Sequence, residues 1–287
     1  MVVTEEALAA LASRHLPAEA ADRWTALLRP AARLVTGPSP GERAVGRLGG
    51  LPRLPADVEW PVWEGHGPLS FVASLDCAAL PTGELDIPLP GSGTLLFFWF
   101  DGRADEHEAC VDYADPATRD GARVLYLPAG TVTAERPAPP GPDPYPARAL
   151  AARVEPTAGD PTAPALHLAF APGDAVIGLP YEHPVCEMEF AHALNELRLG
   201  PEHQVGGHGR PVISAVELWA SRDDLGIDWD DPRLLPDAGE WLLLAQFDSD
   251  AETGMEWADG GVIYWTMRRE DLAAGRFDRA MFTWQSG

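Results

Sequence analysis

The sequence predicts a mainly β or α+β fold, formed as one compact β-rich domain with a helical extension at its N-terminus. Short apolar runs rich in aromatic and β-branched residues recur along the chain, and proline and glycine separate them. The 287 residues suffice for one large domain or two medium ones. A chain of this length buries roughly 75% of its unfolded surface, so its core needs no disulfide or metal.

Residues 1–36 are predicted to form the helical extension and residues 37–287 the β-rich domain. Two short helices are expected within residues 4–34. Thr4 is suited to cap the first helix, because its side chain accepts a hydrogen bond from the first turn. Pro17 suits the first position of the second helix, where a missing N–H costs nothing.

Strands are expected to dominate the rest of the chain. The predicted strands are 69–75, 94–100, 122–127, 131–135, 165–170, 212–219, 241–247, 261–267 and 280–284. A proline-rich stretch at 136–147 is expected to be an extended connector. A helix is predicted at 184–198, where apolar residues recur at helical spacing, and a helical turn at 269–274.

Two parts of the β-rich region resemble each other. In each part a glycine pair is followed by an apolar strand that ends in Asp and then by a glycine-led aromatic strand. The first part has these features at 49–50, 71–76 and 93–99, and the second at 206–207, 243–248 and 260–265. The pattern leaves two interpretations open, an old duplication or two similar hairpins.

The chain is strongly acidic, with a formal net charge of -23 from 44 acidic and 21 basic residues. Such a surface repels phosphate backbones and anionic lipids, so neither nucleic acid nor a membrane is the expected partner. It attracts basic proteins, which makes a basic protein the expected partner. A role in solubility alone explains the same charge.

The cysteines and the N-terminus predict a cytoplasmic protein. Cys77, Cys110 and Cys186 are odd in number and widely spaced, which argues against a disulfide framework and a zinc knuckle. The first residues lack the basic and apolar regions of a signal peptide. The longest apolar run, 95–100, is too short to span a bilayer.

The densest carboxylate cluster is Asp248, Asp250, Glu252 and Asp259, around Gly254. A calcium-binding EF-hand needs Gly at its sixth position and Glu at its twelfth. Here Gly254 falls at the seventh position and Asp259 at the twelfth. The spacing therefore favours a solvated acidic turn, and no metal or cofactor is predicted, although another kind of cation site stays open.

Three of the ten tryptophans are predicted to take part in surface recognition. Trp60, Trp63 and Trp257 lie in polar, loop-like sequence beside acidic residues, whereas most of the others lie in or near predicted strands. Tryptophan anchors cores and is also enriched at interface hot spots.

Catalytic motifs are not recognisable in the sequence. The segment around Ser39 has the letters G-x-S-x-G, but two prolines and the lack of a preceding strand exclude a nucleophile elbow. Neither a Walker loop nor a G-x-G-x-x-G fingerprint occurs.

Several segments, taken in order, resemble the YwqG-like family of bacterial proteins. They are Leu48-Gly-Gly-Leu-Pro-Arg-Leu-Pro55, Pro68-Leu-Ser-Phe-Val-Ala-Ser-Leu-Asp76, Glu202-His-Gln-Val-Gly-Gly207, Gly254-Met-Glu-Trp-Ala-Asp259 and Gly261-Val-Ile-Tyr-Trp265. The resemblance implies a mainly β or α+β domain without an established activity, and a role as an immunity protein of a toxin system. The family often has Gln before the Leu-Asp pair; Ser74 departs from this, while Gln246 keeps it.

The sequence therefore predicts a binding protein, immunity-like, that docks a basic partner through its acidic surface. The predicted binding residues are Trp60, Trp63, Gln246, Asp248, Asp250, Trp257 and Asp259. The alternative is a metal-dependent or other enzyme with its site near the 248–259 loop.

Overall fold

The computed structural model of the protein describes residues 3–112, 115–173, 177–197 and 200–287. Its main element is a ten-stranded antiparallel sheet with the order β14-β13-β12-β11-β1-β10-β2-β6-β7-β8. These strands are β1 (Arg29–Thr36), β2 (Gly46–Leu48), β6 (Ser70–Asp76), β7 (Thr94–Trp99), β8 (Ala122–Leu127), β10 (Arg148–Thr157), β11 (His203–Gly206), β12 (Trp241–Asp248), β13 (Val262–Arg268) and β14 (Met281–Gln285). The predicted β-rich single domain is confirmed.

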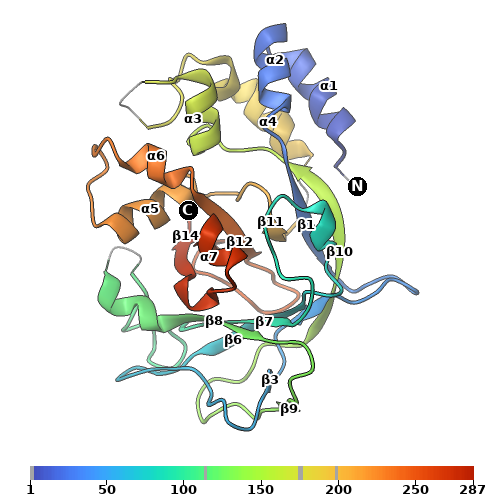
Figure 1. The fold of residues 1–287 in the computed structure, drawn as a ribbon, viewed down its shortest axis with the longest axis vertical. Coiled ribbons are helices and arrows are strands. Elements are labelled where there is room, and N and C mark those ends of the chain that lie inside the picture. Colours follow the sequence, from blue (N-terminus) through green and yellow to red (C-terminus); the bar gives the residue numbers. More distant parts are fainter. Residues whose placement is uncertain (1–2, 113–114, 174–176, 198–199) are drawn as a thin grey trace.

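Two small sheets and several helices complete the fold (Figure 1). The small sheets pair β3 (Arg53–Leu54) with β9 (Ala134–Glu135), and β4 (Val62–Trp63) with β5 (Gly67–Pro68). The helices are α1 (Glu5–His15), α2 (Ala18–Thr25), α3 (Pro164–Phe170), α4 (Met188–Glu196), α5 (Val216–Leu225), α6 (Leu234–Ala238) and α7 (Arg269–Ala273).

The N-terminal helices form a second, smaller core with the helices of the later chain. Thr4 caps α1 as predicted, because its Oγ1 accepts the Ala7 N–H at 3.2 Å. Trp24 of α2 is 1% exposed and packs edge-on against Phe190 of α4. Helices α1, α2 and α4 therefore stand together at one end of the molecule (Figure 1).

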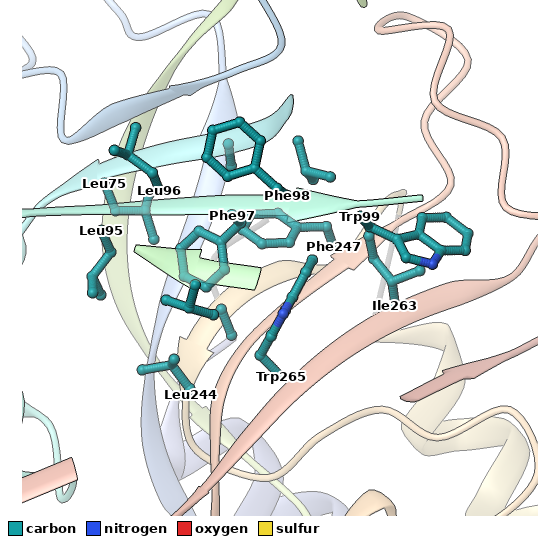
Figure 2. Close-up of a cluster of buried hydrophobic side chains, with 14 of the residues drawn as sticks. Leu75, Leu95, Leu96, Phe97, Phe98, Trp99, Leu244, Phe247, Ile263 and Trp265 are labelled. Carbon is teal, nitrogen blue, oxygen red and sulfur yellow. The ribbon is translucent and has the colours of Figure 1, made fainter. Parts of the chain in front are cut away.

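The main core lies where the sheet curls and its two ends face each other. The Phe97 ring on β7 lies 5.2 Å from the Phe247 ring on β12 and 5.1 Å from the Trp265 ring on β13. Figure 2 shows these three rings meeting between the strands, while Phe98 projects from the opposite face of β7. Edge-to-face packing of this kind stabilises the contact beyond the burial of apolar area.

The two ends of the sheet repeat one pairing scheme. We call β2, β6, β7 and β8 the N-terminal half, and β11 to β14 the C-terminal half. Each half begins with a short strand at whose end the chain passes through a glycine pair at positive φ, Gly49-Gly50 after β2 and Gly206-Gly207 at the end of β11. Gly207 needs this conformation and also lacks room for a side chain, since a Cβ would lie 2.5 Å from the Thr157 Oγ1.

The register repeats residue by residue. Arg47 pairs with Ser74 in the N-terminal half, and Gln204 pairs with Gln246 in the C-terminal half. Each half has an irregularity one residue before the Ala of the long strand. It falls between Phe71 and Ala73 in the N-terminal half and between Leu243 and Ala245 in the C-terminal half. Two unrelated hairpins do not share register and irregularity, so the structure favours duplication.

Strands β1 and β10 join the halves at the centre of the sheet. They pair along their length, from Arg29 opposite Thr157 to Thr36 opposite Leu150. On their outer sides β1 pairs with β11 and β10 pairs with β2.

Several local predictions were wrong. The expected helix reaching residue 34 ends at Thr25, and Arg29–Thr36 is strand β1, in which Ala32 and Leu34 are buried and Arg33 between them is partly exposed. The expected strand 165–170 lies in α3, and the expected strand 212–219 covers the segment before α5 and the first turn of that helix. A short apolar run does not distinguish a strand from a buried helix. The predicted strand 131–135 shrinks to β9.

The remaining helix predictions agree in part. The 184–198 helix divides into a 3₁₀ turn, Pro184–Cys186, and α4, and its last residue lies outside the described ranges. The predicted turn at 269–274 is α7.

Candidate functional site

Two predicted binding residues of β12, Gln246 and Asp248, hydrogen-bond to Glu202, which precedes β11. Gln246 is fully buried, accepting the Arg210 N–H at 2.9 Å and donating to the Glu202 carbonyl at 2.7 Å. Asp248 is 7% exposed and accepts the Glu202 N–H at 2.9 Å. Burial raises the pKa of Asp248, although the Glu202 N–H and the Arg210 guanidinium oppose the shift.

Asp250 lies in a buried pair with His203. The His203 Nδ1 accepts the Asp248 N–H at 3.1 Å, which assigns the ring proton to Nε2, 3.3 Å from the Asp250 Oδ2. The hydrogen bond from His203 lowers the pKa of Asp250. Because both ring nitrogens are engaged, His203 has no free lone pair to act as a base. The pair orders the turn after β12.

The other predicted binding residues do not join this buried pair. Trp257 is 1% exposed in the main core and donates to the Phe247 carbonyl at 3.1 Å. Trp63 is 7% exposed and stacks on His66 at 3.9 Å, while Trp60 is partly buried against Phe98. Asp259 is exposed. The structure thus brings together Gln246, Asp248 and Asp250, places the Trp257 side chain in the main core beside Phe247, and leaves Trp60, Trp63 and Asp259 outside this cluster.

The cysteines are all free thiols in different surroundings. Burial raises the pKa of Cys77 to about 12 and also raises the pKa of Cys110 and Cys186. A thiol with a raised pKa is a poor nucleophile at neutral pH. Within the described ranges, His, Cys, Asp and Glu side chains nowhere gather in a group of three or more suited to a metal ion.

An open groove of about 750 Å³ lies on the N-terminal half, on the face away from the main core. We call it the N-terminal groove. Arg47, Ser74, Leu96 and Leu127 come from its four strands, and Arg53 comes from β3. Its volume lies within the usual range for small-molecule sites. The groove is not recognisable in the sequence, because most of its lining residues are small and all come from segments far apart in the chain.

An exposed aromatic patch lies on α5, the segment before it and the loop after it. Trp229, between α5 and α6, is 39% exposed and lies between exposed Asp228 and Asp230. Its ring lies 4.7 Å from the Trp219 ring, whose Nε1 donates to Ser214 Oγ at 2.8 Å. The adjoining Val212 and Ile213 are 41% and 61% exposed. The Asp-Trp-Asp triplet was the signal available in the sequence.

The model of a family described as "Domain of unknown function (DUF1963)" matches residues 46–286. The chain belongs to the DUF1963 family. No curated protein matches it.

The DUF1963 match begins at the first residue of β2 and ends one residue after β14. It therefore includes both halves of the sheet, the N-terminal groove and the aromatic patch, but neither α1 and α2 nor the central strand β1. Helices long and apolar enough to cross a membrane are absent from the described residues.

Proposed function

We propose that this DUF1963 protein is a cytoplasmic binding protein of the YwqG-like type, whose acidic surface docks a basic protein as an immunity protein docks a toxin. The observation that carries the proposal is the exposed Trp229 between two exposed aspartates. Tryptophan is among the residues that contribute most to protein interfaces, and its ring binds cations.

The patch of Val212, Ile213, Trp219, Trp229, Asp228 and Asp230 has the make-up of a docking surface. Its centre is apolar and aromatic, while its flanks are acidic, as in interfaces with an apolar core and a polar rim. The Arg222 guanidinium lies 5.1 Å from the Trp229 ring and fixes its orientation. A lysine or arginine of a partner fits the outer face between the carboxylates.

The net charge of -23 supports the choice of a basic partner, because long-range attraction speeds its approach. The predicted binding residues that are buried contribute to the fold and not to the contact with the partner. Asp248 and Asp250 are 7% and 4% exposed, so they shape the fold near β11 and leave the contact to exposed carboxylates such as Asp259.

The proposal is tested by capture of proteins from the lysate of the native host at low and moderate salt. The baits are the wild type and the triple variant Asp228→Asn, Trp229→Ala, Asp230→Asn. We expect the wild type to retain a basic protein in a salt-sensitive manner, and the triple variant to retain it at least about tenfold less, the equivalent of one hot-spot residue.

A matched control variant tests whether retention of the partner depends on this patch or on the acidity of the whole surface. Asp57→Asn with Glu59→Gln removes two exposed carboxylates elsewhere and should retain the partner like the wild type. Equal retention by all three baits, or equal loss in both variants, contradicts docking at Trp229.

A further inference from the structure

The C-terminal half shows how the outer face of this sheet is covered. One side chain from each of its four strands holds the segment 206–214. Gln204 donates to the His208 carbonyl at 2.8 Å and Gln246 accepts the Arg210 N–H at 2.9 Å. The Tyr264 hydroxyl donates to the Arg210 carbonyl at 2.7 Å.

The fourth strand completes this arrangement. The Gln285 Oε1 accepts the N–H groups of Val212 and Ile213, each at 2.8 Å. Helix α5 then follows and packs over the same face, with Val216 against Val262. The face is therefore closed by the protein's own backbone.

The repeated register identifies the matching positions of the N-terminal half. The residues that correspond to Gln204, Gln246, Tyr264 and Gln285 are Arg47, Ser74, Leu96 and Leu127. All four line the N-terminal groove. The chain that follows Gly49-Gly50 runs instead to β3, which pairs with β9, and so leaves this face uncovered.

The replacements change the chemistry of the face. In the C-terminal half, amide and phenol groups hydrogen-bond to the backbone of 206–214. In the N-terminal half two leucines, one serine and one arginine take their places, so the groove does not suit a second backbone segment. Leu96 and Leu127, which are 1% and 8% exposed, form an apolar floor with Ala149 of β10, while Arg47 and Arg53 provide positive charge. A pocket with an apolar wall and a few charged groups suits a small organic ligand.

The charges of the groove favour an anion. In the C-terminal half, Arg210 lies 3.6 Å from Asp248. In the N-terminal half the matching carboxylate, Asp76, also lines the groove, but it lies 3.7 Å from Arg43 and accepts the Ala78 N–H, which leaves Arg47 and Arg53 as the unpaired charges among the described residues of the groove. Within the described residues neither Arg47 nor Arg53 is paired with a carboxylate; each donates to a backbone carbonyl.

We propose that the N-terminal groove binds a small amphipathic carboxylate. The carboxylate binds Arg47 and Arg53, whose forked guanidinium groups match its geometry, and the apolar part lies on Leu96 and Leu127. This function is separate from protein docking at Trp229.

The experiment measures displacement of the fluorescent anion 8-anilinonaphthalene-1-sulfonate from the full chain by octanoate and by 1-octanol. We expect octanoate to displace the dye at a concentration at least about tenfold lower than 1-octanol, because only octanoate engages the arginines. Equal potency of the two, or no bound dye, overturns the proposal.

Variants locate the binding. Arg47→Gln with Arg53→Gln keeps N–H donors for the carbonyls and should weaken octanoate at least about tenfold while leaving 1-octanol unchanged. Arg148→Gln neutralises an exposed β10 arginine that does not line the groove and should bind like the wild type.

A second variant, which fills the groove with larger side chains and is called the filling variant, tests the proposal even if the arginine variant unfolds. Ser74→Gln with Leu96→Tyr introduces the side chains of the matching C-terminal positions and should abolish binding of both dye and octanoate while the circular dichroism spectrum stays unchanged. Unchanged octanoate binding in a folded filling variant overturns the proposal.

Discussion

The two halves of the sheet share a pairing scheme and differ in what covers them. Facing inward, both halves carry large apolar side chains, such as Phe97 and its counterpart Trp265, which pack on each other. Facing outward, the C-terminal half carries polar side chains that hold its own chain, and the N-terminal half borders an open groove. The inward-facing side chains of the sheet therefore determine the fold, whereas the outward-facing side chains are free to change in function.

The largest expected difference between the halves comes from Gln246 and its counterpart Ser74. Gln246→Ala leaves the buried Glu202 carbonyl and the part-buried Arg210 N–H without their partner, and should lower the free energy of unfolding by about 2–3 kcal/mol. Ser74→Ala, in the open groove, should change it by less than about 0.5 kcal/mol. Urea denaturation of both variants measures the difference, and equal losses contradict the comparison.

A smaller effect is expected at Asp250. The lowered pKa means that the ionised carboxylate stabilises the fold above its unfolded pKa near 3.8, and that this contribution is lost as the pH falls further. Asp250→Asn should lower the free energy of unfolding at pH 7 by about 2 kcal/mol, since the charge-assisted bond from His203 is lost.

Unfolding measured from pH 7 to pH 2 checks this result. The difference between wild type and Asp250→Asn should shrink below pH 3.8, where the carboxylate of the wild type also becomes protonated. A difference that is constant across this range shows that Asp250 acts through packing alone.

The smallest predicted effect concerns Asp223 on α5, the helix that covers the C-terminal half. Burial raises its pKa to about 7, although Arg222 and Arg119 oppose the shift. Its protonated form is favoured in the folded state, so this residue makes stability fall as the pH rises from about 4 to 7. In the wild type, the free energy of unfolding should fall by about 1 kcal/mol over this pH range because of Asp223, after allowance for solvent screening. In Asp223→Asn, urea denaturation over the same range should show that this fall is absent. Identical pH profiles for the two proteins contradict this assignment.

The sequence predicts the strands of the inner core well, and the central strands poorly. Strands β7 and β13 are found to within one residue, because aromatic and β-branched side chains mark them. Strand β10, the longest of the sheet, escapes prediction because alanine and arginine dominate it and Pro156 lies near its end. Its strand character comes from pairing with β1 and β2.

The candidate site shows the same limit. The sequence singles out Gln246, Asp248 and Asp250, which do lie close together, because neighbours along one strand stay neighbours in space. It does not show that they are buried, since β11 and Arg210 arrive from elsewhere in the chain. The N-terminal groove is invisible in the sequence, because register alone brings Arg47, Ser74, Leu96 and Leu127 to one face.

The position of β1 and β10 has a consequence for how such a protein arises. In the chain β1 precedes the N-terminal half and β10 precedes the C-terminal half, yet β1 pairs with β11 of the C-terminal half and β10 pairs with β2 of the N-terminal half. A half-length precursor would lack an interior strand and would complete its sheet only by exchanging that strand with a second copy. Fusion of two such copies turns an intertwined dimer, whose stability depends on concentration, into a single chain that folds by itself at any dilution.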